Sequence, residues 1–192
     1  MISINKNFLT PEEVNAIINY IEYDTPKDWN ATKSRFWHNR TFDLNSINNA
    51  NSKDQLIIEL IVNIRKRIIK NITEIQGITV PIYGDTLQIV RWPKGYEQPP
   101  HSDCEQNNPE DGEHPYPHRI YSSICYLNDD FEGGELYFPQ HNLTLKPEPG
   151  MMVEFSGTRE YLHGVRPVIN GIRYTIISFY TTDINKADNW TI

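Results

Sequence analysis

The residues best suited to metal chemistry are a histidine and an aspartate one position apart, His101 and Asp103. Side chains alternate across an extended strand, so on such a strand both would point the same way, with an imidazole nitrogen and a carboxylate oxygen at one place. A second histidine from a distant segment would complete the two-histidine, one-carboxylate set that holds non-haem ferrous iron and leaves positions free for oxygen and a cosubstrate. We expect His163 to be that third ligand.

A two-residue pattern occurs by chance in many chains, and alone it is more typical of a polar loop than of a metal site. The other histidines have weaker support. His114 and His118 are four residues apart, which suits a metal on a helix, but the prolines among them argue against a helix. We expect all four remaining histidines to be surface or loop residues: His38, His114, His118 and His141.

Four blocks of sequence, in a fixed order, strengthen the interpretation of His101 and Asp103 as metal ligands. They are residues 87–96 (LQIVRWPKGY) leading into His101-Ser102-Asp103, residues 126–139 (YLNDDFEGGELYFP), residues 146–150 (KPEPG), and residues 163–174 (HGVRPVINGIRY). In these blocks, over residues 85–182, the chain resembles the prolyl 4-hydroxylase-like branch of the Fe(II)/2-oxoglutarate-dependent dioxygenases.

The resemblance implies a double-stranded β-helix, or jelly roll, in which distant ligands meet at one end of a barrel. It assigns Fe(II) to His101, Asp103 and His163, with 2-oxoglutarate and O2 as cosubstrates and ascorbate as a candidate further cofactor. Arg173 occupies the position of the cation that grips the far carboxylate of 2-oxoglutarate, because a guanidinium can bind a carboxylate through two parallel hydrogen bonds. Tyr126 either assists the same carboxylate or is an ordinary core tyrosine.

The reaction that the resemblance implies is hydroxylation, most simply of proline in a peptide or protein. Because Asp103 is retained, the chain is expected to be a hydroxylase rather than a related halogenase, which needs that position vacant. A free amino acid or other small molecule is an alternative substrate. A non-catalytic jelly-roll binding domain is the alternative from another class, and it would be expected to lose a metal ligand or the cosubstrate cation.

The substrate would lie in a groove at the edge of the site. Its expected lining residues are Trp92, Tyr96, Arg119 and Arg166, with a structural role as the equal alternative for the two arginines. Trp92 stands where the family usually has tyrosine, and its indole N–H can donate but cannot accept a hydrogen bond. A cosubstrate contact from Trp92 and a packing role are therefore both open. The polar segment 104–118 is expected to be a mobile edge of the substrate cleft rather than an inert insertion.

Composition limits the remaining possibilities. The chain has 192 residues, 38% of them hydrophobic, enough for one domain with a single core. A net charge of -7 argues against nucleic acid as a partner. No apolar run is long enough to span a membrane and no signal-peptide pattern is present, so a cytoplasmic protein is expected. A monomer is the default expectation for so short a chain without an obvious exposed helical seam. The two cysteines, Cys104 and Cys125, are expected to be free thiols.

The coarse pattern is helices first and strands afterwards. Thr10-Pro11-Glu12-Glu13 predicts a helix start. Residues 24–51 predict an irregular wrap or short edge strands, with a wall of the substrate cleft as the alternative for their aromatic residues. A second helix is predicted from Ser52 to about Ile72, with Arg65, Lys66 and Lys70 on a solvated face. Its predicted apolar stripe is Leu56, Ile57, Leu60, Ile61, Ile64, Ile68 and Ile69.

Strands broken by Pro and Gly are predicted from about Ile78. The predicted fold class is therefore α+β, with a single domain over residues 1–192. Helical support would occupy about residues 1–77 and the double-stranded β-helix about residues 78–182.

Overall fold

Antiparallel sheets form the body of the protein. The computed structural model describes residues 1–24, 29, 36–43 and 52–190. A six-stranded sheet has the order β1 (Ser3–Asn5), β9 (Met152–Ser156), β5 (Tyr121–Tyr126), β12 (Ile172–Thr181), β3 (Tyr83–Pro93) and β2 (Thr41–Asp43). A four-stranded sheet has the order β4 (Gln98–His101), β10 (His163–Val165), β7 (Leu136–Phe138) and β8 (Leu143–Leu145). β11 (Val168–Asn170) pairs with β6 (Glu132–Gly133).

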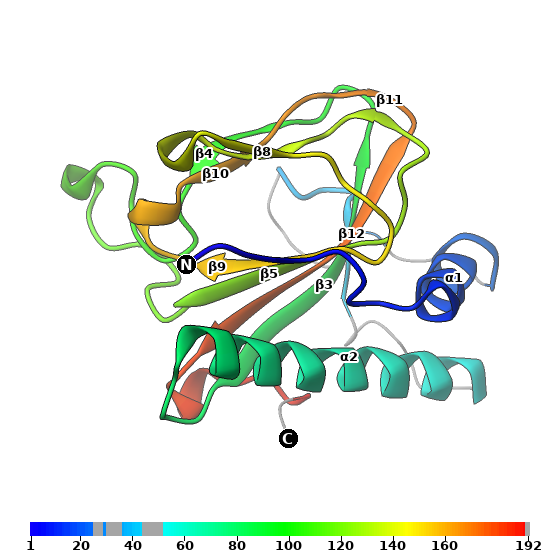
Figure 1. Ribbon diagram of the computed structural model, residues 1–192, viewed down its shortest axis with the longest axis horizontal. Helices are drawn as coiled ribbons and strands as arrows, with labels where there is room; N and C mark the ends of the chain where they lie inside the picture. Colours follow the sequence, from blue (N-terminus) through cyan, green and yellow to red (C-terminus); the bar gives the residue numbers. More distant parts are fainter. Residues whose placement is uncertain (25–28, 30–35, 44–51, 191–192) are drawn as a thin grey trace.

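Two helices cover the outer face of the six-stranded sheet, as Figure 1 shows. They are α1 (Pro11–Asn19), continued by a π-helical turn over Tyr20–Asp24, and α2 (Ser52–Gln76). The Thr10 hydroxyl accepts a hydrogen bond from the Glu13 amide, and the Glu13 carboxylate accepts one from the Thr10 amide. This reciprocal capping box confirms the predicted helix start.

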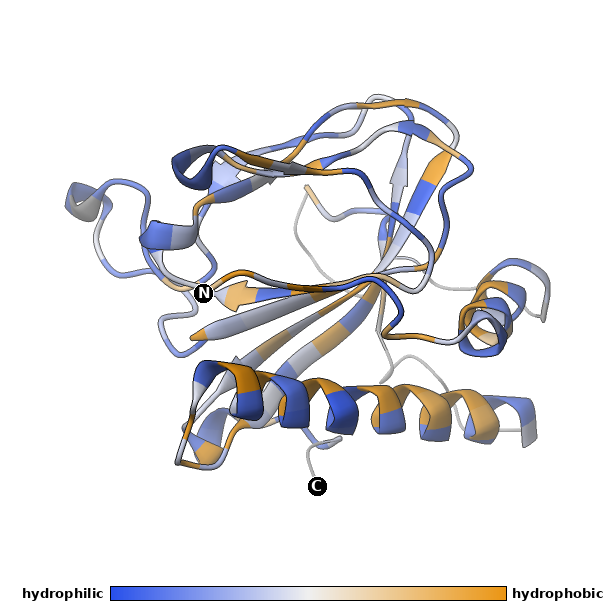
Figure 2. Ribbon diagram, viewed as in Figure 1, coloured by the Kyte–Doolittle hydropathy of each residue, from blue (hydrophilic) through white to orange (hydrophobic). Residues whose placement is uncertain are grey.

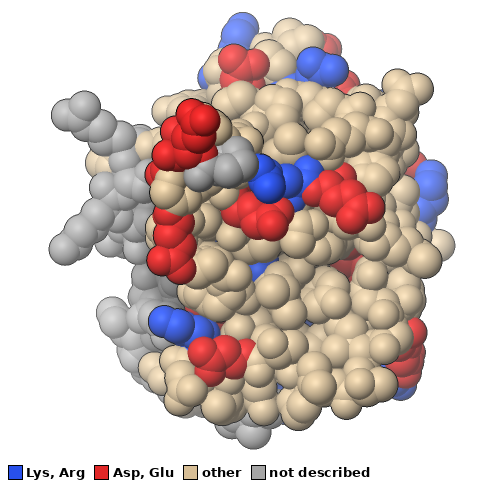
Figure 3. Space-filling view, turned by 90° about the vertical axis from the view of Figure 1, so that its left-hand side faces the viewer, with Lys and Arg blue, Asp and Glu red and all other residues tan. Residues whose placement is uncertain are grey.

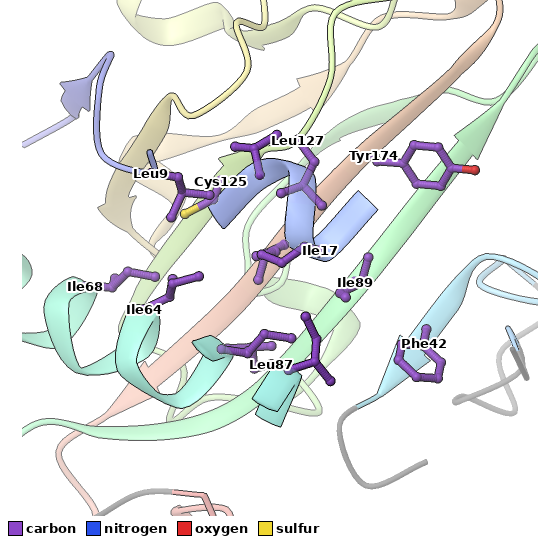
Figure 4. Packing of buried hydrophobic residues seen from close by; sticks show 14 of the residues in the cluster. Leu9, Ile17, Phe42, Ile64, Ile68, Leu87, Ile89, Cys125, Leu127 and Tyr174 are labelled. Atoms are coloured by element: carbon purple, nitrogen blue, oxygen red, sulfur yellow. The ribbon is translucent and has the colours of Figure 1, made fainter. Parts of the chain in front are cut away.

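The main core fills the space between these helices and the sheet. Ile17 of α1 and Ile64 and Ile68 of α2 pack toward Leu87 and Ile89 of β3 (Figure 4). Along α2, hydrophobic and hydrophilic residues alternate in the manner of an amphipathic helix (Figure 2). The helices therefore brace one side of the sheet, as predicted.

Two residues of α2 depart from the predicted pattern. Leu56, predicted in the apolar stripe, is 65% exposed, whereas Ile58 is buried. Arg65, predicted on the solvated face, is only 2% exposed. Its Nη1 donates to both carboxylate oxygens of Asp188, at 2.6 and 2.7 Å. Arg65 is buried because of tertiary structure. The C-terminal segment brings the carboxylate of Asp188 to the helix, and Gly84 leaves room for the guanidinium.

The N-terminal part of the chain also contributes two strands, β1 and β2. The sequence did not predict β1, and it predicted β2 only as one of the possible structures for its segment. β1 pairs with β9 at one edge of the large sheet. β2 pairs with β3 at the other edge, in the segment predicted to form a wrap or short edge strands. Most of that segment lies outside the described residues, but Trp29 is buried in the main core.

The smaller sheet lies over the other face of the large sheet, and the arrangement is the predicted double-stranded β-helix (Figure 1). Apolar residues of both sheets, including Ile124, Phe138 and Phe155, pack between them. The rest of this space is the cavity described below. Within the described residues, none of the helices has the length and apolar character needed to cross a bilayer.

Candidate iron and 2-oxoglutarate site

A cavity of about 240 Å³ opens between the two sheets. Its lining includes every predicted metal ligand and the predicted cosubstrate cation: His101, Asp103, His163 and Arg173. Among the described residues, these first three also form the group of histidine and carboxylate side chains whose ligand atoms lie within 4.8 Å of one another.

Strand pairing places the ligands. His101 ends β4 and His163 begins β10, and the two residues lie directly opposite each other in the antiparallel ladder. Asp103 follows two residues after β4, where its amide donates to the Gly157 carbonyl at 2.9 Å. The Ser102 hydroxyl donates to the same carbonyl at 2.6 Å. A Cβ on Gly157 would lie 2.3 Å from the Arg119 carbonyl oxygen, so this close approach requires glycine.

The histidine tautomers follow from their hydrogen bonds. Nδ1 of His101 lies 3.1 Å from the Pro99 carbonyl, and Nδ1 of His163 lies 3.1 Å from the Tyr161 carbonyl. A carbonyl can only accept, so each Nδ1 carries the proton and each Nε2 is unprotonated and presents a lone pair. These Nε2 atoms lie 3.5 and 3.7 Å from the Asp103 carboxylate oxygens. Such support of the outer nitrogen is typical of histidines that bind metals.

The charge states also suit a divalent cation. Burial raises the pKa of Asp103, but the neighbouring His163 and His101 and the Ser122 hydroxyl more than offset this effect and bring it to about 2. Burial lowers the pKa of His163 to about 4, although Asp103 opposes the shift. At neutral pH the site therefore offers a carboxylate and a neutral imidazole. Two nitrogens and one carboxylate oxygen are the donor set that ferrous iron takes in oxygenases.

The Ser122 hydroxyl donates to Asp103 Oδ2 at 2.5 Å, and both residues are buried. This bond fixes the carboxylate and leaves Oδ1 nearer to His101. The side-chain nitrogen of Gln98 lies 3.1 Å from Nε2 of His101. An ion bound to His101 would take the place of this last hydrogen bond.

Arg173 is buried deep in the same cavity. It is 1% exposed, and its Nε and Nη2 have no hydrogen-bond partner among the described residues. The same holds for Trp92 Nε1, the Tyr126 hydroxyl and the Thr175 hydroxyl. Trp92 lies directly opposite Arg173 in the β3–β12 ladder, and Tyr126 directly opposite Thr175 in the β5–β12 ladder. Burial lowers the pKa of Arg173, and Tyr126 raises it.

Buried polar groups normally have partners, and an unpaired buried cation is costly. A cation surrounded by unsatisfied donors is therefore suited to an anionic ligand with several acceptor oxygens. The far carboxylate of 2-oxoglutarate is such a group.

The structure separates the four predicted substrate residues. Trp92 and Arg119 line the cavity, while Tyr96 and Arg166 are outside its described lining. Arg119 donates to Asp85 and, at 3.1 Å, to the Thr86 hydroxyl. The exposed Arg166 stacks on Tyr137, with its guanidinium carbon 4.0 Å from the ring centroid.

Further residues of the cavity lining come from segments for which the sequence left two interpretations open. Trp37 reaches the cavity, which fits the alternative interpretation of the aromatic residues in segment 24–51. His114 and Tyr116 bring the segment 104–118 to the cavity, as expected for an edge of the cleft. His38, His114 and His118 lie outside helices and strands, whereas His141 ends the 3-10 helix Pro139–His141, where its Nε2 lies 2.9 Å from the Glu160 carbonyl oxygen. Both cysteines are free. Ser122 had no motif to mark it, since only tertiary folding brings it to Asp103.

Comparisons with known proteins agree with this site. Residues 87–181 match the model of the 2OG-Fe(II) oxygenase superfamily. A segment of 73 residues is 40% identical to prolyl 3-hydroxylase 2 of Rattus norvegicus, and it takes in 35% of this chain but only 10% of that protein. The chain thus spans a small part of the length of the curated relatives that it matches.

Two solved structures share the fold. One is the viral collagen prolyl hydroxylase from Paramecium Bursaria Chlorella virus-1 in its 2OG complex, with a TM-score of 0.66, 19% identity and coverage of 93% of this chain and 94% of that chain. The other is a prolyl hydroxylase from Trichoplax adhaerens in complex with a hypoxia inducible factor peptide fragment, with a TM-score of 0.62, 19% identity and coverage of 94% and 83%. These structures show the shared fold, and the match of residues 87–181 places that part of the chain in the 2OG-Fe(II) oxygenase superfamily.

Proposed function

We propose that this protein is a 2-oxoglutarate-dependent dioxygenase that hydroxylates proline in a peptide or protein. The observation that supports it most directly is the presence, in one cavity, of the His101, Asp103 and His163 cluster and of the buried Arg173 guanidinium, whose Nε and Nη2 have no hydrogen-bond partner among the described residues. A binding domain that had only kept the scaffold would have no need for either feature, because an unpaired buried charge lowers stability.

The chain's own residues would bind and orient the reactants. His101, Asp103 and His163 would hold Fe(II), and Arg173 would hold the far carboxylate of 2-oxoglutarate. When bound, these groups supply the oxidation chemistry, in which O2 and 2-oxoglutarate give a hydroxylated substrate, succinate and CO2. Apolar residues such as Phe155 and Ile177 in the cavity wall would exclude water from the site.

Two features support a peptide as the substrate. The segmental relative is named a prolyl 3-hydroxylase, and the Trichoplax protein is named as a prolyl hydroxylase with a bound peptide fragment. His114 and Tyr116 bring the segment 104–118 to the cavity lining, where it could contact a long substrate. Figure 3 shows one face of the molecule, on which residues other than Lys, Arg, Asp and Glu cover most of the described surface.

The test is mass spectrometry of proline-containing peptides and of free proline after incubation with Fe(II), 2-oxoglutarate and O2. We expect a gain of one oxygen on the peptide, with succinate formed in equal amount, and loss of both products in His101→Ala. His141→Ala is the matched control, because this histidine lies outside the cavity lining. Chromatography of the hydrolysed product then distinguishes 3-hydroxyproline from 4-hydroxyproline.

The other outcomes separate the alternatives. Oxidation of free proline or another small molecule without oxidation of peptides would replace the peptide proposal. Peptide binding without succinate formation would indicate a non-catalytic binding domain. Ascorbate as reductant and a monomeric state belong to the same proposal. They are tested by omitting ascorbate from the assay and by light scattering of the purified protein.

A further inference from the structure

Arg40 is a second buried arginine beside the cavity, and neither the proposed reaction nor the sequence motifs use it. It is 1% exposed, and Nε, Nη1 and Nη2 all lack a hydrogen-bond partner among the described residues. Burial lowers its pKa to about 10, so it still carries its charge at neutral pH. A buried charge with three unpaired nitrogens costs several kcal/mol, of the order that ion burial generally costs.

Aromatic rings surround this guanidinium in place of hydrogen-bond acceptors. Its central carbon lies 4.2 Å from the centroid of Phe36, 4.7 Å from Trp37, 4.6 Å from Trp92 and 4.4 Å from Tyr96. Each desolvated contact of this kind contributes about 0.5–2 kcal/mol, so four of them offset much of the burial cost. We call Arg40 and these four rings the arginine cage.

The arginine cage and the cosubstrate end of the cavity share one residue. Trp92 belongs to the cage, and the Arg173 guanidinium carbon also lies over its ring, 5.4 Å from the centroid. Trp37 meets Trp92 edge to face, with centroids 5.5 Å apart and an interplanar angle of 81°. A rotation of the indole would therefore break contacts with Arg40, Trp37 and Arg173 together.

Arg40 cannot act on a ligand in the cavity directly. It is absent from the described lining, whereas Trp92, Trp37 and Arg173 are part of it. Backbone bonds hold Arg40 at the edge of the large sheet, where its amide donates to the Trp37 carbonyl at 3.1 Å and its carbonyl accepts from the Arg91 amide at 2.9 Å. Any effect on the site would pass through Trp92 or Trp37, and Trp92 is the ring that the Arg173 guanidinium also contacts.

We propose that Arg40 is a positioning residue for 2-oxoglutarate, which fixes the Trp92 indole and thereby the direction in which Arg173 presents its unpaired donors. This inference rests on the proposed function. Its physical reason is that a bidentate hydrogen bond depends on orientation, so a guanidinium that can tilt against a loose ring binds a carboxylate less tightly.

The decisive experiment measures binding rather than turnover. Isothermal titration without O2 gives the Kd of Mn(II) and then of 2-oxoglutarate for the Mn(II)-loaded protein. We expect Arg40→Met to raise the 2-oxoglutarate Kd about tenfold, which corresponds to the loss of one strong cation–π contact, and to leave the Mn(II) Kd unchanged. Arg40→Lys, which keeps the charge, should restore part of the affinity.

Arg67→Met is the matched control, because Arg67 also stacks on a ring, 5.1 Å from the Phe8 centroid, but lies on α2. An unchanged 2-oxoglutarate Kd in Arg40→Met overturns the inference, and so does an equal loss of Mn(II) and 2-oxoglutarate binding, which would show general damage. If Arg40→Met does not fold, Tyr96→Leu decides, because this ring is 41% exposed and its loss loosens the same cage. A raised 2-oxoglutarate Kd in Tyr96→Leu supports the inference, and an unchanged one overturns it.

An NMR spectrum of the metal-free protein tests this inference separately from the proposed function. The indole N–H signal of Trp92, assigned by its loss in Trp92→Phe, should move in Arg40→Met and stay in place in Arg67→Met. A signal that does not move overturns the contact between Arg40 and Trp92 whatever the protein binds. A different outcome is that the wild-type protein loaded with Mn(II) binds no 2-oxoglutarate, although the Trp92 signal still moves in Arg40→Met. This outcome overturns the proposed function and the role of Arg40 toward 2-oxoglutarate. The contact between Arg40 and Trp92 would still stand.

Discussion

His101 and His163 face each other across the β4–β10 ladder with ring centroids 4.4 Å apart, and each bonds through Nδ1 to the carbonyl two residues earlier in its own segment. The same local bond thus sets the same tautomer in both residues. The free Nε2 atoms point toward Asp103, and the site is preorganised for a metal before one binds.

Ser122 is the residue outside the ligand set whose removal should most directly affect metal affinity. Ser122→Ala removes the 2.5 Å hydrogen bond to Asp103 Oδ2, so the carboxylate is free to rotate. We expect Fe(II) or Mn(II) affinity to fall about 10- to 100-fold, the usual effect of losing such a support. Titration with Mn(II) measures it. Ser178→Ala is the control, since this buried serine of the same sheet bonds to the Thr86 carbonyl, and an equal loss there would refute the specific role of Ser122.

Substitution of Arg173 should lower the affinity for 2-oxoglutarate without lowering the stability of the ligand-free protein. Arg173→Met should weaken 2-oxoglutarate binding by roughly 100-fold or more, because two charge-assisted hydrogen bonds are lost. Arg173→Lys should lose less, since it keeps the charge without the planar fork. In the absence of 2-oxoglutarate, Arg173→Met should melt no lower than the wild type, because it removes an unpaired buried cation. Scanning calorimetry with and without 2-oxoglutarate tests both points, and a Met variant that binds normally would contradict the assignment.

The Arg65–Asp188 pair should be the most important ion pair for stability among those that the structure describes. Asp188→Asn leaves Arg65 buried without its counter-charge, and we expect the free energy of unfolding to fall by about 3 kcal/mol. The exposed pair Lys6–Glu148 provides the comparison, with side chains 64% and 48% exposed. Glu148→Gln should cost less than about 1 kcal/mol. Urea denaturation of both variants measures the difference, and equal losses would show that Asp188 does not anchor the C-terminal segment.

Glu154 should make stability depend on pH. Its side chain is buried on β9, and burial raises its pKa more than the hydrogen bond from Asn71 lowers it. A raised pKa in the folded state means that stability falls as pH rises, beginning above the unfolded value of about 4.3 and ending above the folded value. Glu154→Gln removes this loss while keeping an acceptor for Asn71.

The two proteins should therefore melt together near pH 4, and the Gln variant should melt higher at pH 7–8. A difference of about 2–4 °C would correspond to 1 kcal/mol in a domain of this size. Thermal melts across this pH range measure the effect, and a constant difference at every pH would show that the Glu154 charge is not the cause.

The sequence by itself indicated the chemistry that we propose for this protein. The candidate metal ligands and the candidate cosubstrate cation lie in sequence blocks that resemble a known family, and the capped first helix follows from a short local pattern. The change from helical periodicity to short strands after Ile78 was also enough for the fold class.

Tertiary structure alone decided which distant side chains support that chemistry. The position of His163 opposite His101, the bond from Ser122 to Asp103, the burial of Arg65 against Asp188 and the cage around Arg40 all join segments far apart in the chain. Local patterns set only which face a side chain occupies. Strand register and the approach of distant segments depend on packing the whole core, and this is why the exposure of Leu56 and the burial of Arg65 differed from the prediction.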